Sequence, residues 1–290
     1  MIAPVPVELR SHNLADLAYP DIQAYLRACD LILVPMASTE QHGPHLPLST
    51  DTVTALEVAA RVAAINNMLH TPVVWTGYSP QHMAGPGEGR GTITIRSSTL
   101  QALLYDIARS LIHHGFNKIV FINGHGSNVK VIDPVLRKIR YDTGAMVGFC
   151  MPYMERYVGL MEGLMENPKE ETPGWHASEL ETSQMLAHDE RLVRMDRAVK
   201  TLTQIPRWLP QTFGKKDGAP DIQFDGYSYF QFPMDHHEFT DSGVIGNPER
   251  ATGAKGEEAF RRYAEHVARA VRELAGVEVQ IRNREFLDRV

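Results

Sequence analysis

Two runs dominated by apolar residues constrain the fold of this chain more than any other feature. They are residues 31–36 (LILVPM) and residues 118–122 (KIVFI). A strand that is covered on both faces has this composition, because neither face contacts solvent. Segments with helical apolar spacing lie between these runs and after them. The pattern therefore predicts strands that are buried between two layers of helices.

The order of the predicted elements indicates a parallel sheet. Helical spacing predicts helices at about 51–66, 97–115, 128–141 and 249–274, and shorter apolar runs predict strands at 72–75, 92–95 and 146–150. Strands that alternate with helices of roughly ten to fifteen residues pair in parallel through right-handed crossovers. We therefore expect an α/β fold, a three-layer α/β/α sandwich with a mostly parallel central sheet. Asp51 stands at the expected N-cap of the first of these helices.

One domain is the simplest organisation for this chain. The 290 residues are 43% hydrophobic and contain no internal repeat or low-complexity linker, so we expect a single domain spanning residues 1–290. Residues 199–246 interrupt the alternation of strands and helices, since they are rich in Pro, Gly, Asp and aromatic residues. We interpret them as long loops that cover the active-site edge of the sheet.

Charge and hydropathy exclude several classes of protein. The chain has 29 Lys and Arg against 35 Asp and Glu, a net charge of −6, which argues against a nucleic-acid partner. No apolar run approaches the roughly 18–20 residues that span a membrane. Cys29 and Cys150 do not form a disulfide framework, and the first residues lack the pattern of a signal peptide. We expect a cytoplasmic protein that acts on a small molecule.

The first polar cluster follows the strand predicted at 31–36. Positions two apart in an extended chain project to the same side, so Glu40 and His42 can reach one point. Prolines and Gly43 then stiffen a turn that returns the chain to Asp51. The three polar side chains are therefore expected at one end of this strand.

Two further clusters follow later elements of the sheet. His125 stands in a glycine-bracketed turn, NGHGSN, directly after the strand predicted at 118–122. The segment WHASELET at 175–182 adds one carboxylate, from either Glu179 or Glu181. Ligands of open α/β sheets bind outside the carboxyl ends of the strands. We therefore expect all of these side chains to converge at one edge of the sheet.

The mixture of imidazole and carboxylate groups predicts a metal centre. These groups suit Zn²⁺, Mn²⁺ or Fe²⁺, and the absence of thiolates argues against a structural zinc site. A carboxylate can bridge two ions about 3.5–4 Å apart, as it does in two-metal hydrolases. Asp51 lies between the other clusters in the sequence and is the natural bridge. We predict two divalent cations, Zn²⁺ or Mn²⁺, with Fe²⁺ as a further candidate.

Other classes of protein fit the sequence less well. A serine hydrolase requires Gly-x-Ser-x-Gly, which residues 124–128 (GHGSN) do not match. A dinucleotide-binding loop requires a third glycine that residues 85–90 (GPGEGR) lack, and this segment precedes a predicted strand. A non-catalytic protein that binds a small molecule through its metal centre remains an alternative to an enzyme.

Four motifs occur in the order of a known family. The first is residues 38–48 (STEQHGPHLPL), with Asp51 behind it. The others are residues 123–128 (NGHGSN), 176–183 (HASELETS) and 242–256 (SGVIGNPERATGAKG). Together they resemble the signature of the creatinine amidohydrolase (creatininase) family and extend over about residues 30–260.

This resemblance implies a fold, a cofactor and an assembly. Members of the family are α/β/α sandwiches with a pair of divalent metal ions, and they form homo-oligomers, often hexamers. Carried over by motif position, His176 is a candidate for proton transfer. The implied metal ligands are Glu40, His42, Asp51, His125 and Glu181.

Two segments differ from creatininase proper. Creatininase has a carboxylate ligand two residues after the His of the second motif, where this chain has Ser127. The Pro-Gly-Thr loop of the family is here residues 83–92 (MAGPGEGRGT). These differences favour the broader branch of the family with NGHG-type motifs, in which Glu181 becomes more important, and they argue against creatinine itself as the substrate.

The resemblance implies a metal-dependent hydrolase that attacks a carbonyl with metal-bound hydroxide. The expected substrate is small and cyclic, with a C–N bond of the cyclic amide or formamide type. Hydrolytic C–C ring opening of an inositol-derived cyclic diketone on the same centre is the alternative. Candidate substrate contacts are Trp175, Arg90 and Ser127. The polar segment 215–238 either binds substrate hydroxyls or forms solvated loops or a subunit contact.

Overall fold

A computed structural model describes residues 4–84, 86–151, 159–166, 176–215 and 221–286. Its central sheet has four strands in the order β2-β1-β3-β4, and all of them are parallel. The strands are β1 (Leu31–Met36), β2 (Leu69–His70), β3 (Lys118–Asn123) and β4 (Met146–Cys150). Every residue of β1 and of β3 is buried, as expected of strands that are covered on both faces.

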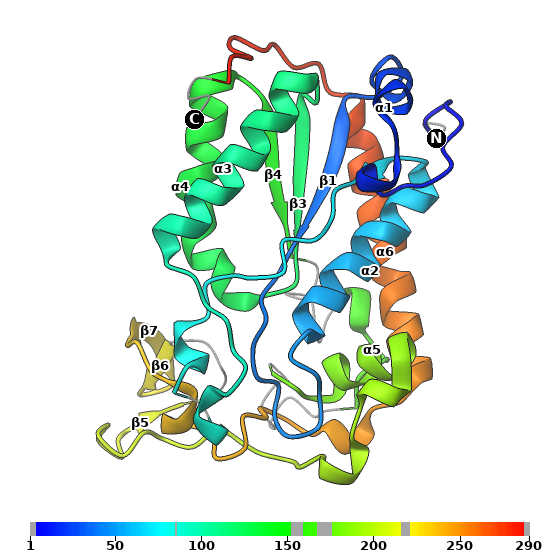
Figure 1. Ribbon diagram of the computed structural model, residues 1–290. Coiled ribbons are helices and arrows are strands. Elements are labelled where there is room, and N and C mark those ends of the chain that lie inside the picture. The colour runs from blue at the N-terminus through cyan, green and yellow to red at the C-terminus, as the bar shows by residue number, and fades with distance from the viewer. Residues whose placement is uncertain (1–3, 85, 152–158, 167–175, 216–220, 287–290) are drawn as a thin grey trace.

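Helices cover both faces of this sheet (Figure 1). One face carries α3 (Ser97–His114) and α4 (Val129–Thr143), and the other carries α2 (Thr50–Asn66) and α6 (Gly253–Ala275). The short helix α5 (Glu179–Asp189) packs against α6 and α2, and α1 (Tyr19–Leu26) lies at the opposite end of the molecule. The predicted α/β/α sandwich with a parallel central sheet is confirmed. Among the helices in the described ranges, none combines the length and apolar composition needed to cross a membrane.

Two of the strands that short apolar runs predict, at 72–75 and 92–95, do not form. The edge strand β2 consists of Leu69 and His70, and residues 72–75 contribute only a single bridge between Met36 and Val74. Pro72 explains the shift, because proline has no backbone N–H to donate to the ladder. Residues 92–95 form isolated bridges to the segments that follow the sheet and add no strand to it.

The start of α2 also differs from the prediction. The N-cap residue is Ser49, and Asp51 is the second residue of the helix. The backbone N–H and the hydroxyl of Thr50 both bond to the carbonyl of Pro47, which starts the helical turn before Asp51. The side chain of Asp51 is therefore not used as a cap and remains available at the end of the sheet.

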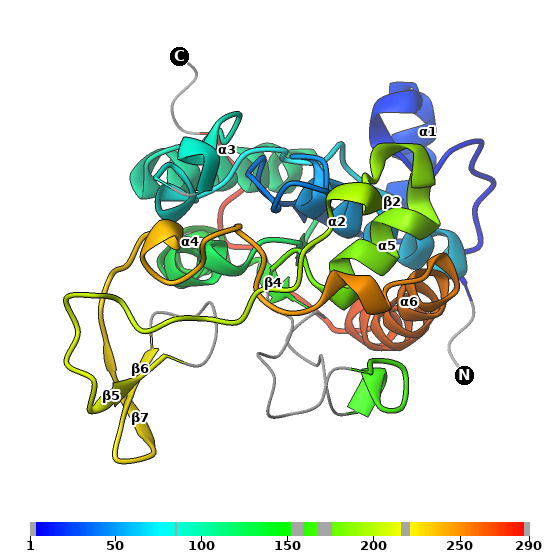
Figure 2. The same ribbon diagram turned by 90° about the horizontal axis from the view of Figure 1, so that it is seen from below.

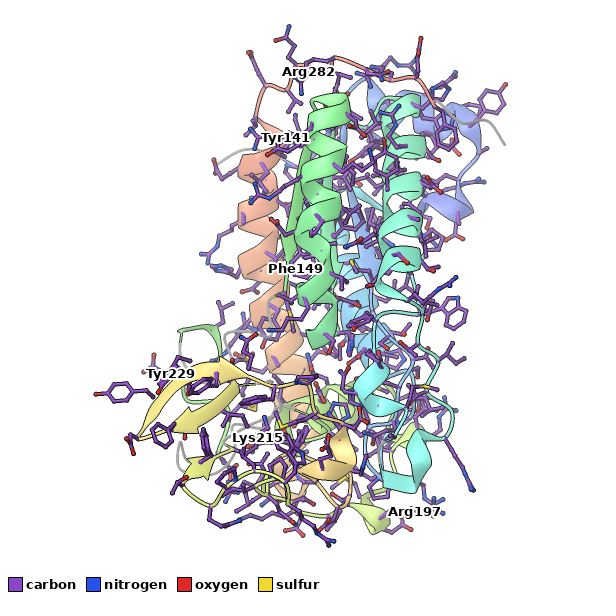
Figure 3. All side chains as sticks on the ribbon, turned by 90° about the vertical axis from the view of Figure 1, so that its left-hand side faces the viewer. Tyr141, Phe149, Arg197, Lys215, Tyr229 and Arg282 are labelled. Carbon is purple, nitrogen blue, oxygen red and sulfur yellow. The ribbon has the colours of Figure 1, made fainter. Side chains whose placement is uncertain are left out.

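The described part of residues 199–246 contains strands as well as loops. It contains a small antiparallel sheet of β5 (Phe213–Gly214), β6 (Asp221–Phe224) and β7 (Tyr227–Gln231), which projects from the body in Figure 2. Asp225 and Gly226, both with positive φ, connect β6 to β7 as a two-residue hairpin turn. Tyr229 projects outward from this sheet in Figure 3 and is 63% exposed, whereas Lys215 is buried.

The contact between α5 and α6 requires a glycine. A Cβ atom added to Gly256 would lie 1.9 Å from the backbone carbonyl oxygen of Ser183. Only a residue without a side chain allows the two helix backbones to approach this closely. This contact holds α6 against the helix that carries Glu181.

We predict that Gly256→Ala lowers the free energy of unfolding by about 1–3 kcal/mol, because the new methyl group meets backbone that cannot move aside. A Gly→Ala change inside a helix ordinarily raises the free energy of unfolding by up to about 1 kcal/mol. A decrease in that free energy therefore indicates a steric clash. Gly148→Ala is the matched control, since its Cβ meets no heavy atom within 4 Å. Urea denaturation followed by circular dichroism measures both variants. An unchanged or stabilised Gly256→Ala protein contradicts the close approach.

Candidate metal centre

Four elements of the fold bring the predicted ligands together at one end of the sheet. The carboxyl ends of β1, β3 and β4 face the lower half of Figure 1, where α2 and α5 begin. Side chains that follow β1 and β3 meet there with side chains from the first turns of α2 and α5. All five predicted ligands belong to this cluster, namely Glu40, His42, Asp51, His125 and Glu181.

Asp51 lies between two groups of candidate ligands. On one side its Oδ2 atom is 3.0 Å from Nδ1 of His125, which is also 3.2 Å from Oε2 of Glu40. On the other side its Oδ1 atom is 3.2 Å from Nε2 of His42, which is 3.7 Å from Oε2 of Glu181. The two groups are thus Glu40–Asp51–His125 and His42–Asp51–Glu181, and they share one carboxylate.

Backbone carbonyls set the orientation of both histidine rings. Nδ1 of His42 donates to the carbonyl of Glu40 at 3.1 Å, and Nε2 of His125 donates to the carbonyl of Tyr78 at 3.0 Å. In the neutral form each ring then has its unprotonated nitrogen turned toward the carboxylates. Hydrogen bonds of this kind fix the tautomer of metal-binding histidines.

The electrostatics of the cluster fit divalent cations. Burial lowers the pKa of His42, but the negative charge of Asp51, followed by Glu181, outweighs it and raises that pKa to about 9. Burial opposes the charged form of His125 too, yet Glu40 and Asp51 hold its pKa well above the usual range. The carboxylates therefore attract positive charge to the positions between themselves and the rings.

Unpartnered buried atoms support the same conclusion. Within the described residues, Oε2 of Glu40, Nε2 of His42 and Oδ2 of Asp51 are buried and form no hydrogen bond. Buried polar atoms without partners are costly, and groups of them mark sites for an ion or a ligand. Each of these atoms faces one of the two ligand groups, so the donor set fits a pair of cations with nitrogen and oxygen ligands.

Gly124 allows β3 to end against the first turn of α2. A Cβ atom at this position would lie 2.3 Å from the backbone carbonyl oxygen of Asp51. The glycine before His125 is therefore a packing requirement that brings the histidine to the carboxylate. This explains the first glycine of the NGHG segment in physical terms.

The two candidate carboxylates of α5 lie in different environments. Glu181 accepts a hydrogen bond from the backbone of Ala177 at 2.6 Å and faces His42. Glu179 is buried in a different environment, where its Oε1 is 2.7 Å from Nζ of Lys255. Ala177 has a φ of 51°, which turns the chain sharply between His176 and the start of α5.

His176 lies beside the candidate ligands. Its ring stacks on that of His42 with centroids 4.1 Å apart. Nε2 of His176 donates to the carbonyl of Gln41 at 2.7 Å, and Nδ1 is 3.9 Å from Oε1 of Glu40. Burial, followed by the charge of His42, lowers the pKa of His176 well below its usual range.

The structure describes two of the three residues predicted to contact substrate, and they lie in different places. Trp175 lies outside the described residues. Arg90 is exposed. Ser127 accepts a hydrogen bond from Gln81 at 2.5 Å and lines a cavity of about 730 Å³, next to but not within the ligand groups.

Sequence reasoning missed three buried residues at the centre. Nε2 of His82 is 3.1 Å from Oε1 of Glu40, and His236 lies against His82 with ring centroids 3.9 Å apart. The side-chain amide nitrogen of Gln41 is within hydrogen-bonding distance of both rings. In the sequence, His236 is recognisable only as one of the polar residues of the segment 215–238. His82 is distinguished only by its position directly before a glycine-rich loop, which does not indicate a functional site.

A buried cluster of imidazoles and carboxylates at the strand ends of a parallel α/β sandwich is the kind of site in which hydrolases hold divalent cations. Comparison with known proteins supports this class. The profile of the creatinine amidohydrolase (creatininase) family matches residues 15–271. The chain belongs to this family, and its relatives are hydrolases.

Relatives of known activity differ in the substrates for which they are named. The chain is 29% identical over 277 residues to creatinine amidohydrolase of Pseudomonas putida, covering 91% of this chain and 97% of the relative. It is 25% identical over 257 residues to 3-dehydro-scyllo-inosose hydrolase of Thermotoga maritima, covering 87% and 80%. It is 29% identical over 253 residues to the mycofactocin precursor peptide peptidase of Mycobacterium tuberculosis, covering 83% and 84%.

Solved creatininase structures share the fold. A creatininase variant complexed with creatine superposes with a TM-score of 0.72 at 28% identity, covering 92% of this chain and 100% of that chain. A manganese form has the same TM-score and coverage at 27% identity. A further variant is a Zn-Zn form. The comparisons do not separate creatininase proper from the broader NGHG-type branch, so that assignment stays a prediction.

If the two ligand groups each hold a cation, two variants should differ in the number of cations that they retain. Asp51→Asn should lose both cations, because it weakens the shared ligand, whereas Glu181→Gln should lose only the cation next to His42. Elemental analysis after dialysis measures the number of ions per chain. The expected contents are two for the unaltered protein, about one for Glu181→Gln and close to none for Asp51→Asn.

Glu179→Gln is the matched control, since it changes a carboxylate of the same helix that faces Lys255. It should retain both cations. Loss of a cation from Glu179→Gln together with full retention in Glu181→Gln contradicts the assignment of the ligands.

Proposed function

We propose that this protein is a divalent-metal-dependent hydrolase that attacks a carbonyl carbon of a small cyclic substrate and cleaves a C–N bond of the cyclic amide or formamide type. One observation carries the proposal. The two oxygens of the buried Asp51 carboxylate face two different imidazoles, each next to a further carboxylate. This is the donor arrangement of a two-metal hydrolase.

Each ligand group has a defined task in this proposal. When bound, the pair of Zn²⁺, Mn²⁺ or Fe²⁺ ions supplies an activated water and polarises the carbonyl. Glu40 and His125 would hold one ion, and His42 and Glu181 would hold the other. Asp51 would contribute to both groups, because one of its oxygens faces His42 and the other faces His125. The rings cannot turn away, since backbone carbonyls hold their other nitrogens.

His176 is the proposed proton carrier. Its Nε2–H is committed to the carbonyl of Gln41, so the neutral ring presents an unprotonated Nδ1 toward the centre. Such a nitrogen can take a proton from the attacking water and return it to the leaving nitrogen. Stacking on His42 restricts the orientation of the ring.

A C–N bond is preferred because relatives named for amide and peptide hydrolysis match most of this chain. The match to 3-dehydro-scyllo-inosose hydrolase favours C–C ring opening of a cyclic diketone as the second candidate. Both reactions begin with water at a polarised carbonyl, so the metal ligands serve either. The segment 215–238 supplies His236 to the centre, which supports a role of its polar groups in substrate choice.

Several further features belong to this proposal. The small-molecule substrate would contact Ser127 from the neighbouring cavity, with Trp175 and Arg90 as further candidates. We also propose a single domain, the broader NGHG-type branch, a cytoplasmic location and a homo-oligomer, a hexamer by analogy with the family. The family profile, which extends over residues 15–271, supports the single domain.

A substrate panel tests the reaction. The protein loaded with Zn²⁺ or Mn²⁺ would be assayed with cyclic amides, N-formyl compounds, short peptides and a polyhydroxylated cyclic diketone. We expect turnover of a cyclic amide or formyl compound with release of a carboxylate. Turnover of the diketone alone selects the second candidate. Tight binding of these compounds without product from any of them contradicts a hydrolase and supports a metal-dependent binding protein.

Replacement of His176 separates proton transfer from metal binding. We predict that His176→Ala keeps both cations but loses about 10²–10⁴-fold in kcat, the usual contribution of a general acid–base residue. Steady-state kinetics and elemental analysis on the same sample measure both effects. His188→Ala, which changes an exposed histidine paired with Glu57, is the control and should keep full activity. Near-normal turnover by His176→Ala shows that another group carries the proton.

A further inference from the structure

A second cluster of buried histidines adjoins the candidate metal centre. His82, His176 and His236 have ring nitrogens within 4.8 Å of one another, a spacing that would also suit a cation. Their ring centroids are 3.9 to 4.9 Å apart. The metal centre alone does not explain why three imidazoles are buried together at this point.

The side chain of Gln41 determines which ring nitrogens are available. Its Oε1 accepts the backbone N–H of Gly43 at 3.0 Å, which fixes the orientation of the amide. Its Nε2 lies 3.1 Å from Nδ1 of His82 and 3.2 Å from Nδ1 of His236. The amide nitrogen has two hydrogens and no lone pair to offer, so both Nδ1 atoms must accept.

Two consequences follow for the imidazoles. A neutral ring that accepts at Nδ1 carries its proton on Nε2, so neither His82 nor His236 can offer Nε2 to a cation. Nε2–H of His82 lies 3.1 Å from Oε1 of Glu40. The other oxygen of Glu40, Oε2, is the buried atom without a hydrogen bond that faces His125.

We propose that Gln41 is a positioning residue that locks His82 and His236 as Nε2–H donors, so that this cluster holds the substrate and the ligand Glu40 rather than a third cation. His82 anchors one oxygen of Glu40 and leaves the other for the metal. His236 presents its N–H to an oxygen of the substrate other than the attacked carbonyl oxygen. The inference rests on the proposed metal centre and extends it to substrate recognition.

The surroundings of His236 support its role as a donor. The residue is 4% exposed, and within the described part of the chain its ring bonds through Nδ1 to Gln41, which leaves Nε2–H for a ligand. A hydrogen bond from Nε2–H to an oxygen of the substrate would satisfy this donor on binding. A hydroxyl, carbonyl or carboxylate oxygen is the group that an imidazole N–H recognises. The substrate class is therefore a cyclic compound with an additional oxygen substituent.

Histidine ring ¹⁵N spectra of the Zn²⁺-loaded protein test the tautomers directly. The expected result is a protonated Nε2 and an unprotonated Nδ1 for both His82 and His236, with two Zn²⁺ ions per chain. Assignment uses the signals that disappear in His82→Gln and His236→Gln. A proton on either Nδ1, or a third Zn²⁺ ion that is lost in His236→Gln, overturns the proposal.

Gln41→Glu tests the positioning role. A carboxylate of the same shape still accepts from Gly43 but offers only acceptors to the two Nδ1 atoms, so both must donate. The neutral ring of His82 then turns an unprotonated Nε2 toward Glu40. We expect cation affinity to fall by about 10- to 100-fold, as it does when residues behind metal ligands are altered. Titration with Zn²⁺ measures this loss without an activity assay. Unchanged affinity overturns the proposal.

A pair of variants at one position tests substrate recognition. His236→Leu should raise KM by about tenfold or more with a smaller change in kcat, because it removes the N–H donor. His236→Gln retains an amide N–H and should recover most of that loss. Equal KM values for Leu and Gln overturn the role of the donor. If the unaltered Zn²⁺-loaded protein turns over no substrate, the proposed function fails, while the tautomers and the cation affinity remain measurable.

Discussion

The arrangement of side chains at the candidate metal centre depends on one buried carboxylate, that of Asp51, whose negative charge requires compensation by positive charge. Asp51 is 3% exposed, and its two oxygens are turned to opposite sides. Removing a carboxylate from water is costly unless positive charge compensates it. In their neutral form the rings of His42 and His125 turn unprotonated nitrogens toward the carboxylate, so compensation must come from protons on these nitrogens or from cations between the atoms. A pair of cations would satisfy both rings and the carboxylate at once.

The fold contributes this arrangement through the parallel sheet. Because β1 and β3 run side by side in register from Leu31 and Lys118 to Met36 and Asn123, the segments after them leave the sheet at the same level. Gly124 then lets the second segment approach the start of α2. Residues separated by more than a hundred positions in the chain are thus brought together by strand pairing and by one close backbone contact.

Much of this geometry is predictable from the sequence. The apolar runs LILVPM and KIVFI identify the central strands, and the polar residues after them identify Glu40, His42 and His125 as neighbours. Asp51 is also predictable, although its place in α2 is not, since the turn at Pro47 decides where the helix begins. The strand predicted at 72–75 does not form, and β2 lies at Leu69–His70 instead. Apolar composition alone does not show that Pro72 has no backbone N–H to donate to the ladder.

Other features depend on information that the sequence pattern does not contain. Glu179 and Glu181 are two residues apart on α5, so they point about 200° apart around the helix. Only their contacts show that Glu179 pairs with Lys255 and that Glu181 faces His42. His82 and His236 come from segments more than 150 positions apart. Their place at the centre follows from hydrogen bonds of one glutamine side chain, which no periodicity reveals.

Anomalous diffraction from crystals of the Zn²⁺- or Mn²⁺-loaded protein tests the central claim most directly. The account predicts two anomalous peaks about 3.5–4 Å apart, one beside each oxygen of Asp51. The first peak should also contact Glu40 and His125, and the second should contact His42 and Glu181. A single peak that binds one oxygen of Asp51, or a peak centred among His82, His176 and His236, would contradict it.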